Sequence, residues 1–162
     1  MSLLKSVMAL VLVMGCSLTA FAGGDFPTNP DSNLTPGSLC NRPNSYRYPE
    51  KIPYCTRNVD TRLKREIFQD YNQKLGYHID MSKRNQFKID HLIPLCAGGS
   101  NNRDNLWPQH SSVYRHTDEM EMVACEKMAD GRVTQRRAID LILEAKKDLS
   151  KAAAILAQFK AM

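Results

Sequence analysis

This 162-residue chain lacks a Cys-x-x-Cys pair, an apolar run long enough to span a bilayer comfortably, and any internal repeat or low-complexity tract. The first absence argues against a structural zinc site, which commonly takes its thiolates from such pairs. The second argues against a membrane-spanning helix, which needs about 20 apolar residues. The short length and the absence of repeats together indicate one domain with a modest core.

The N-terminal residues 1–22 have the pattern of an export signal. Lys5 precedes an apolar run, and the segment ends in Ala20-Phe21-Ala22, the small-x-small pattern that signal peptidase cuts. We therefore expect cleavage after Ala22 and a secreted or periplasmic protein. Two alternatives are an N-terminal helix of the domain and a lipoprotein anchored through Cys16.

Cleavage of the signal leaves an even number of cysteines in an oxidising compartment. The remaining four predict two disulfides, and their spacing leaves all three pairings open. Loss of Lys5 lowers the formal net charge from +5 to +4, and a basic chain attracts polyanions such as nucleic acid or anionic lipid. The four cysteines are Cys40, Cys55, Cys96 and Cys125.

Local patterns divide the mature chain into a lead-in and one α+β domain. Residues 23–39 are rich in Gly, Pro, Asn and Ser, which predicts a flexible N-terminal segment before a domain over residues 40–162. The domain is expected to contain a helix, a short β-hairpin with a long loop, and two or three further helices. The expected elements are a helix between Asp60 and Gly76, strands within Phe87–Leu95, a loop over Cys96–Asp104, a helix from about Pro108 through Ser111 to Met128, and a helix from Thr134 that continues or breaks near Ser150.

The segment Phe87–His110 contains residues suited to hydrolysis of a phosphodiester. That reaction needs a base to activate water and a cation to neutralise charge on the phosphate. His91 has an ordinary pKa near neutrality, and Asp90 offers oxygen ligands to a hard divalent ion. Neighbouring residues on a strand point to opposite faces, so both can serve one site only if the strand is distorted or ends there. Pro94 and the glycines that follow favour such a distortion.

The same segment resembles the signature of HNH endonucleases, the ββα-metal or His-Me finger nucleases, in a branch of small exported bacterial proteins. The matching residues are Asp90-His91-x-x-Pro94, Gly98-Gly99-Ser100-Asn101 and Asn105-Leu106-Trp107-Pro108. A weaker similarity extends over Cys55–Lys146. The resemblance implies a ββα-metal core, in which a β-hairpin and a helix hold one divalent ion.

The resemblance also implies a role for each matched residue. His91 corresponds to the general base, Asp90 to the metal ligand before it, and Asn105 to the asparagine that braces the loop. The second metal ligand falls in the helix, where His110 is preferred over His116. The ion expected is Mg²⁺, with Mn²⁺, Ni²⁺ and Zn²⁺ as alternatives.

Two arginines near the motif are candidates for binding phosphate. Arg103 lies in the expected loop and Arg115 in the helix that follows it, although arginines on exposed surfaces commonly serve solubility alone. The resemblance further suggests that the disulfides are Cys55–Cys125 and Cys40–Cys96.

The function expected is a metal-dependent endonuclease of low sequence specificity, acting on nucleic acid, with DNA ahead of RNA. One alternative is an exported, disulfide-stapled nucleic-acid-binding module or adhesin that keeps the HNH scaffold without turnover. Another alternative is a nuclease that acts as a toxin, which would have an immunity protein as its partner.

Overall fold

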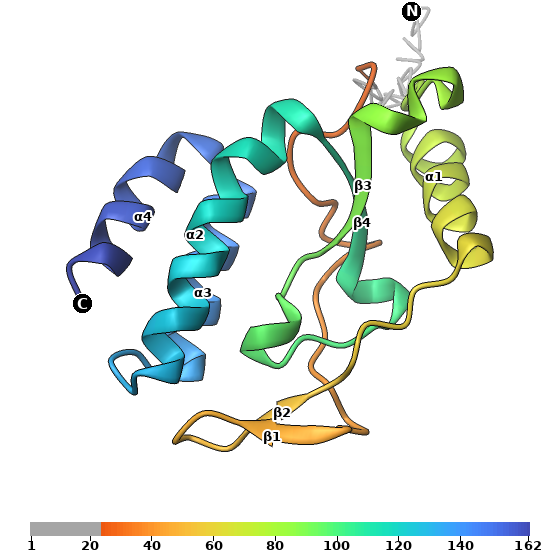
Figure 1. The fold of residues 1–162 in the computed structure, drawn as a ribbon. Helices are drawn as coiled ribbons and strands as arrows, with labels where there is room; N and C mark the ends of the chain where they lie inside the picture. The colour runs from red at the N-terminus through yellow and green to blue at the C-terminus, as the bar shows by residue number, and fades with distance from the viewer. Residues whose placement is uncertain (1–23) are drawn as a thin grey trace, which may run out of the picture.

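The structure is a computed structural model that describes residues 24–162, and its helices and two small antiparallel sheets confirm the α+β class (Figure 1). The expected signal, including Cys16, lies outside the described residues. Within residues 24–162, no helix is both long and apolar enough to cross a bilayer. The helices and strands are β1 (Ser45–Arg47), β2 (Ile52–Tyr54), α1 (Thr61–Leu75), β3 (Phe87–His91), β4 (Leu106–His110), α2 (Ser111–Ala129), α3 (Gln135–Lys147) and α4 (Ala152–Lys160), with short 3₁₀ turns between several of them.

The β3–β4 hairpin lies between α1 on one side and the α2–α4 layer on the other (Figure 1). Its antiparallel register pairs Phe87 with His110 and Asp90 with Trp107. The predicted first strand is confirmed by β3. The second strand differs from the prediction, because it follows the long loop and includes Pro108, which was expected to start a helix. Among residues 24–162, β4 pairs with β3 alone in a two-stranded sheet, and a proline is tolerated there because the other edge of β4 needs no N–H donor.

Helix α1 has the boundaries that its caps predict. The side chain of Asp60 accepts a hydrogen bond from the Leu63 amide, and Gly76 ends the helix with a φ of 72°, which favours glycine. Buried Ile67, Phe68 and Tyr71 pack α1 against the hairpin. This apolar contact fixes the position of the connection that leads into α1.

Residues 24–39 are held against the domain, in contrast to the flexible segment predicted for 23–39. Thr35 is buried, and its hydroxyl lies 2.9 Å from the Tyr71 hydroxyl and donates to the Leu106 carbonyl at 3.1 Å. Leu39 forms an isolated antiparallel bridge with Gly99. Composition alone did not show these contacts, because each joins the segment to residues far along the chain.

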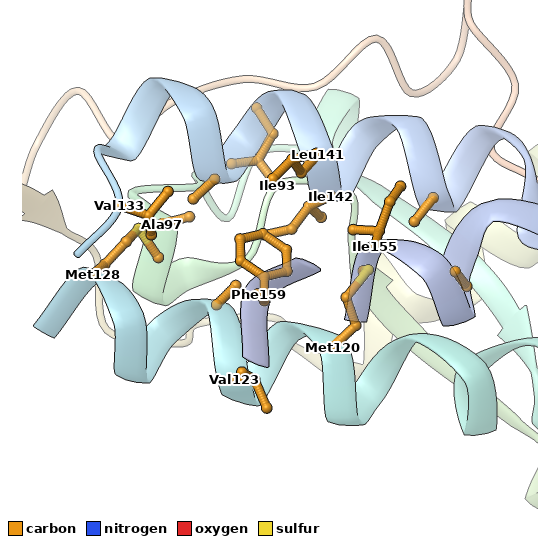
Figure 2. Close-up of a cluster of buried hydrophobic side chains, with 14 of the residues drawn as sticks. Ile93, Ala97, Met120, Val123, Met128, Val133, Leu141, Ile142, Ile155 and Phe159 are labelled. Atoms are coloured by element: carbon orange, nitrogen blue, oxygen red, sulfur yellow. The ribbon is translucent and has the colours of Figure 1, made fainter. Parts of the chain in front are cut away.

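Helices α2, α3 and α4 pack around a second apolar cluster (Figure 2). Met120 from α2, Ile142 from α3 and Phe159 from α4 are fully buried in it. The predicted helix over Ser111–Met128 is confirmed, and Thr134 caps α3 as predicted by accepting from the Arg137 amide. The predicted break near Ser150 is a 3₁₀ turn over Leu149–Lys151 before α4. This layer brings the C-terminal end of α3 close to β3.

All four predicted cysteines form disulfides, but the expected pairing is wrong. The bridges are Cys40–Cys55 and Cys96–Cys125, each with a Cα–Cα distance of 5.8 Å. The β1–β2 hairpin folds between Cys40 and Cys55 and brings these two residues together. The 3₁₀ turn over Leu95–Ala97 packs against α2, which places Cys96 beside Cys125. The second bridge therefore clamps the loop after β3 to the helical layer.

Candidate functional site

His91 is the last residue of β3, and its imidazole is held at both nitrogens. It is 3% exposed, with Nδ1 3.1 Å from Nη1 of Arg57 and Nε2 3.1 Å from Oδ1 of Asn101. A guanidinium only donates, so Nδ1 must accept, and Nε2 must carry the proton that it donates to Asn101. The contacts therefore select one neutral tautomer, whose basic nitrogen faces Arg57.

The surroundings of His91 keep the imidazole neutral. Burial is the largest cause and lowers its pKa to about 4; the hydrogen bond to Asn101 opposes this shift, and the charge of Arg57 adds to it. An imidazole must be neutral to accept a proton from water. His91 is therefore in the protonation state of a general base throughout the physiological pH range.

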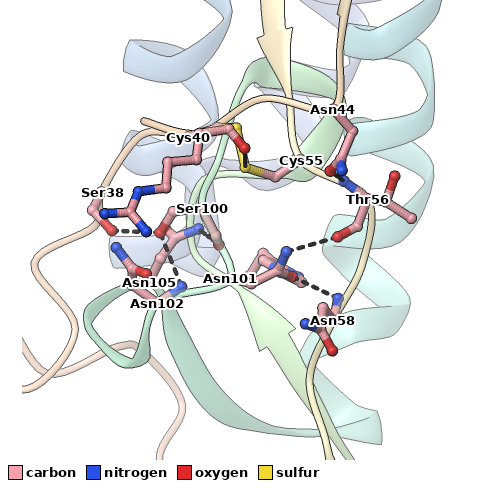
Figure 3. Close-up of a disulfide and its surroundings, with 12 residues drawn as sticks. Ser38, Cys40, Asn44, Cys55, Thr56, Asn58, Ser100, Asn101, Asn102 and Asn105 are labelled. Atoms are coloured by element: carbon pink, nitrogen blue, oxygen red, sulfur yellow. Dashed lines mark hydrogen bonds between the residues drawn. A yellow bond between two sulfur atoms is a disulfide. The ribbon is translucent and has the colours of Figure 1, made fainter.

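The loop residue Asn101 fixes the orientation of the imidazole. Its Nδ2 donates to the Thr56 carbonyl at 2.8 Å, and its Oδ1 accepts from the Asn58 amide at 3.1 Å (Figure 3). These bonds direct the amide oxygen toward His91. Arg57 is exposed and lies in the same connection, where Nη2 donates to the Ile89 carbonyl at 2.8 Å. A cation open to solvent thus lies beside the basic nitrogen.

Asn105 ties together the two ends of the loop that follows His91. Its Oδ1 accepts from the Ile93 amide at 2.9 Å, and its Nδ2 donates to the carbonyls of Ile93 and Ser100 at 3.0 and 2.9 Å. Asn105 is fully buried, so these bonds are shielded from water. Gly99 permits this close approach, because a Cβ there would lie 1.8 Å from the Ile93 carbonyl oxygen. The loop bearing Asn101 is thereby held beside His91.

Asp90 takes its partners from the other side of the hairpin. Its Oδ2 accepts a hydrogen bond of 2.9 Å from Nζ of Lys146 on α3, and its Oδ1 lies 3.4 Å from Nζ of Lys88. Burial would raise the pKa of the Asp90 carboxyl, but Lys146 and Lys88 outweigh it and hold that pKa below its usual value. The side chains of Asp90 and His91 therefore do not converge, in keeping with the alternation of an undistorted strand.

Lys146 joins Asp90 to a second carboxylate. Its Nζ forms an ion pair with Oε1 of Glu121 on α2 at 2.7 Å, and it also donates to the His91 carbonyl at 2.5 Å. Burial raises the pKa of Glu121 to about 7, although Lys146 opposes the shift. Burial alone would lower the pKa of Lys146, but the two carboxylates raise it. Lys146 thus stays charged in the interior.

The structure does not bring His110 to Asp90. His110 is the N-cap of α2, where Nδ1 accepts from the Ser112 amide, and its ring stacks on Phe26 with centroids 3.9 Å apart. The register places it three residue pairs from Asp90, roughly 10 Å along the hairpin. His116 is exposed on α2.

The residues expected to bind a metal ion do not fit one in this arrangement. Asp90 is occupied by Lys146, and His110 lies at the other end of the hairpin. Over residues 24–162, no group of three or more His, Cys, Asp or Glu side chains is placed to hold a metal ion.

The two candidate phosphate-binding arginines lie apart from each other. Arg103 forms an ion pair with Asp70 on α1, and Arg115 is exposed on α2. The carboxylate of Asp70 already neutralises Arg103. Neither arginine is a hydrogen-bond partner of the His91 imidazole.

Sequence reasoning assigned no role to Arg57, Asn101, Glu121 or Lys146. One signal could have identified Lys146, because it follows Ala138 and Ile142 at four-residue spacing on the apolar face of α3. A lysine at such a position must be paired when it is buried. No comparable local signal distinguishes Arg57 from the other arginines of the chain.

Comparisons with family models, with curated proteins and with solved structures found no match to this chain.

Proposed function

We propose that this protein is an exported endonuclease that hydrolyses phosphodiester bonds of nucleic acid, with His91 as its general base. The observation that carries the proposal is the neutral, oriented imidazole whose Nδ1 lies 3.1 Å from an exposed guanidinium. A base and a cation side by side are the two groups that attack of water on a phosphate requires. The two disulfides are consistent with export.

In the proposed reaction, the Arg57 guanidinium binds the phosphate and a water molecule takes its place at Nδ1 of His91. Guanidinium groups bind phosphate oxygens in pairs, so the phosphorus would lie close to that water. Nδ1 accepts a proton from the water as its oxygen attacks the phosphorus. The bond to the 3′ oxygen breaks, that oxygen takes a proton from solvent, and the product keeps a 5′-phosphate. Asn101 and Asn105 act as positioning residues.

Digestion of supercoiled plasmid and of RNA by the purified, oxidised protein tests this function. We expect nicked and then linear plasmid with 5′-phosphate ends, and cleavage slower by about 10²–10⁴ with His91→Ala protein prepared in the same way. Parallel reactions with Mg²⁺, Mn²⁺, Ni²⁺, Zn²⁺ and EDTA show which ion, if any, the reaction requires. Equal cleavage by the two proteins would remove His91 from the mechanism and point to a contaminating nuclease.

A basic groove beside α1 supports nucleic acid as the substrate. It has a volume of about 430 Å³ and includes three cationic residues, Lys64, Arg65 and Arg84. The helix that forms one wall begins only four residues after Arg57. A strand bound at Arg57 could therefore continue along α1 through contacts between its phosphates and these cations.

Reversing charge in this groove should weaken binding without removing the base. We expect Lys64→Glu/Arg65→Glu to lower affinity for a short DNA duplex by about tenfold or more in low salt, and to reduce the salt slope by about 1–2. The matched control is Arg136→Glu/Arg137→Glu, which reverses two exposed arginines on α3. Fluorescence anisotropy with the His91→Ala protein measures binding without cleavage. Equal effects of the two double variants would mean that net charge alone matters.

One observation favours the alternative of a binding module without turnover. The pairing of Asp90 with Lys146, and of both His91 nitrogens with protein groups, would also suit a scaffold that only holds its shape. Salt-sensitive binding of DNA with no cleavage in any of the four ions or in EDTA would establish that alternative.

A further inference from the structure

One buried ammonium group lies among three oxygens where β3, α2 and α3 meet. Nζ of Lys146 is 2.9 Å from Asp90 Oδ2, 2.7 Å from Glu121 Oε1 and 2.5 Å from the His91 carbonyl oxygen. The Lys146 side chain is 0% exposed, and those of Asp90 and Glu121 are 11% and 17% exposed. The oxygens of Asp90 and His91 accept hydrogen bonds from the ammonium, and Glu121 forms an ion pair with it.

The same three oxygens make up the kind of ligand set that a hard cation takes. Two carboxylates and a backbone carbonyl are typical partners of Ca²⁺, which binds oxygen at about 2.3–2.6 Å. The 2.5 Å distance to the His91 carbonyl oxygen lies within that range, and the distances to Glu121 and Asp90, 2.7 and 2.9 Å, exceed it by only a few tenths of an ångström. Lys88 does not take the place of Lys146 as the cation among these oxygens, because its Nζ lies 3.4 Å from Asp90 and also pairs with Asp118.

We propose that Asp90, Glu121 and the His91 carbonyl form a cation site that the chain fills with its own Lys146 ammonium, and that shortening Lys146 opens this site to a divalent cation. Removal of the four terminal atoms of the lysine leaves room among oxygens that no longer have a positive partner. A hard divalent ion such as Ca²⁺ or Mn²⁺, completed by water, restores the balance of charge there. In the native protein, a divalent ion can enter only by displacing Lys146.

The inference concerns binding and does not depend on the proposed nuclease activity. If plasmid is not cleaved, the cation site is unaffected. If the cation site fails its test, the His91–Arg57 arrangement remains.

Calorimetric titration with CaCl₂ and MnCl₂ of the purified protein, Lys146→Ala and Lys146→Ala/Glu121→Gln tests the proposal. We expect one ion per chain for Lys146→Ala beyond the level of the native protein, and loss of that ion when Glu121→Gln is added. Lys147→Ala is the matched control, because Lys147 is the exposed neighbour on the same helix. Equal binding by the native protein and Lys146→Ala overturns the proposal, and so does binding that survives Glu121→Gln.

Loss of Lys146 leaves two buried carboxylates, and if Lys146→Ala is isolated unfolded at neutral pH, its refolding serves as the test. Circular dichroism then compares the variant in CaCl₂ with the variant in choline chloride of equal ionic strength. Recovery of the folded spectrum in Ca²⁺ alone supports the site, because an ion that binds only the folded state drives folding. Failure to recover in either Ca²⁺ or Mn²⁺ overturns it.

Discussion

Lys146→Met is expected to lower the free energy of unfolding by about 3–5 kcal/mol, because it leaves a buried charge cluster without its cation. The methionine fills most of the lysine volume, so the loss is chiefly electrostatic. Asp90 and Glu121 would then face each other across the interior with no counter-charge at their shared position. For a domain of this size, such a change removes a large fraction of the total stability, which is about 5–15 kcal/mol.

Chemical denaturation of the oxidised protein at neutral pH, followed by circular dichroism, measures this change. The matched control is Lys147→Met at the exposed next position, which should change stability by no more than about 0.5 kcal/mol. The triple variant Asp90→Asn/Glu121→Gln/Lys146→Met should recover much of the loss, because it removes all three charges together. The loss should also shrink as pH falls and the carboxylates take up protons. A Lys146→Met protein as stable as Lys147→Met would show that the cluster is open to water.

The elements that the sequence predicted well are those with signals inside them. Asp60 and Gly76 mark the two ends of α1, and Thr134 marks the start of α3, through bonds that reach only a few residues along the chain. The α+β class followed from the same local patterns. Such signals do not depend on residues far along the chain, because both partners of each bond belong to one helix.

The predictions that failed depend on contacts between distant segments. The pairing of Cys40 with Cys55 requires the β1–β2 hairpin, whose three-residue strands have no clear signal in the sequence. The docking of residues 24–39 depends on Tyr71 and Leu106, which lie far along the chain. Pro108 belongs to β4 because this segment pairs with β3. The local propensity of a segment does not show with which strand it pairs.

The candidate site was predictable where its residues are close in sequence. His91 ends β3, Asn105 lies at the far end of the loop that follows it, and the motif includes both; Asn101 is part of the motif as well, but the sequence did not show that its side chain holds the imidazole. The orientation of Asp90 was not predictable, since it depends on whether β3 remains regular to its end. The cation that pairs with Asp90 lies 56 residues away on α3. Lys146 could therefore be identified as this cation only from the packing of the helical layer against the hairpin.

His91→Ala is expected to lower the rate of cleavage by about 10²–10⁴, the usual contribution of a positioned general base. The base also determines how activity depends on pH. Because burial lowers the pKa of His91 to about 4, the imidazole stays neutral as pH falls, and it becomes protonated only near pH 4. Activity should therefore persist at pH 5.5, where an imidazole with the ordinary pKa of about 6.5 would have lost about tenfold. A histidine with its ordinary pKa would instead give an activity that falls below about pH 6.5.

Measurement of kcat/KM between pH 3.5 and 8 tests this expectation, with circular dichroism at each pH to confirm that the protein remains folded. Two variants should shift the acid limb in opposite directions. Arg57→Gln removes a charge that lowers the pKa of His91, so kcat/KM of this variant should begin to fall at a higher pH than that of the native protein. Asn101→Ala removes a hydrogen bond that raises the pKa of His91, so kcat/KM of this variant should begin to fall at a lower pH. Both variants also lower the rate, but a purely structural role would not separate their limbs. A native limb near pH 6.5 would mean that the imidazole is hydrated and that the base is not held as the structure shows.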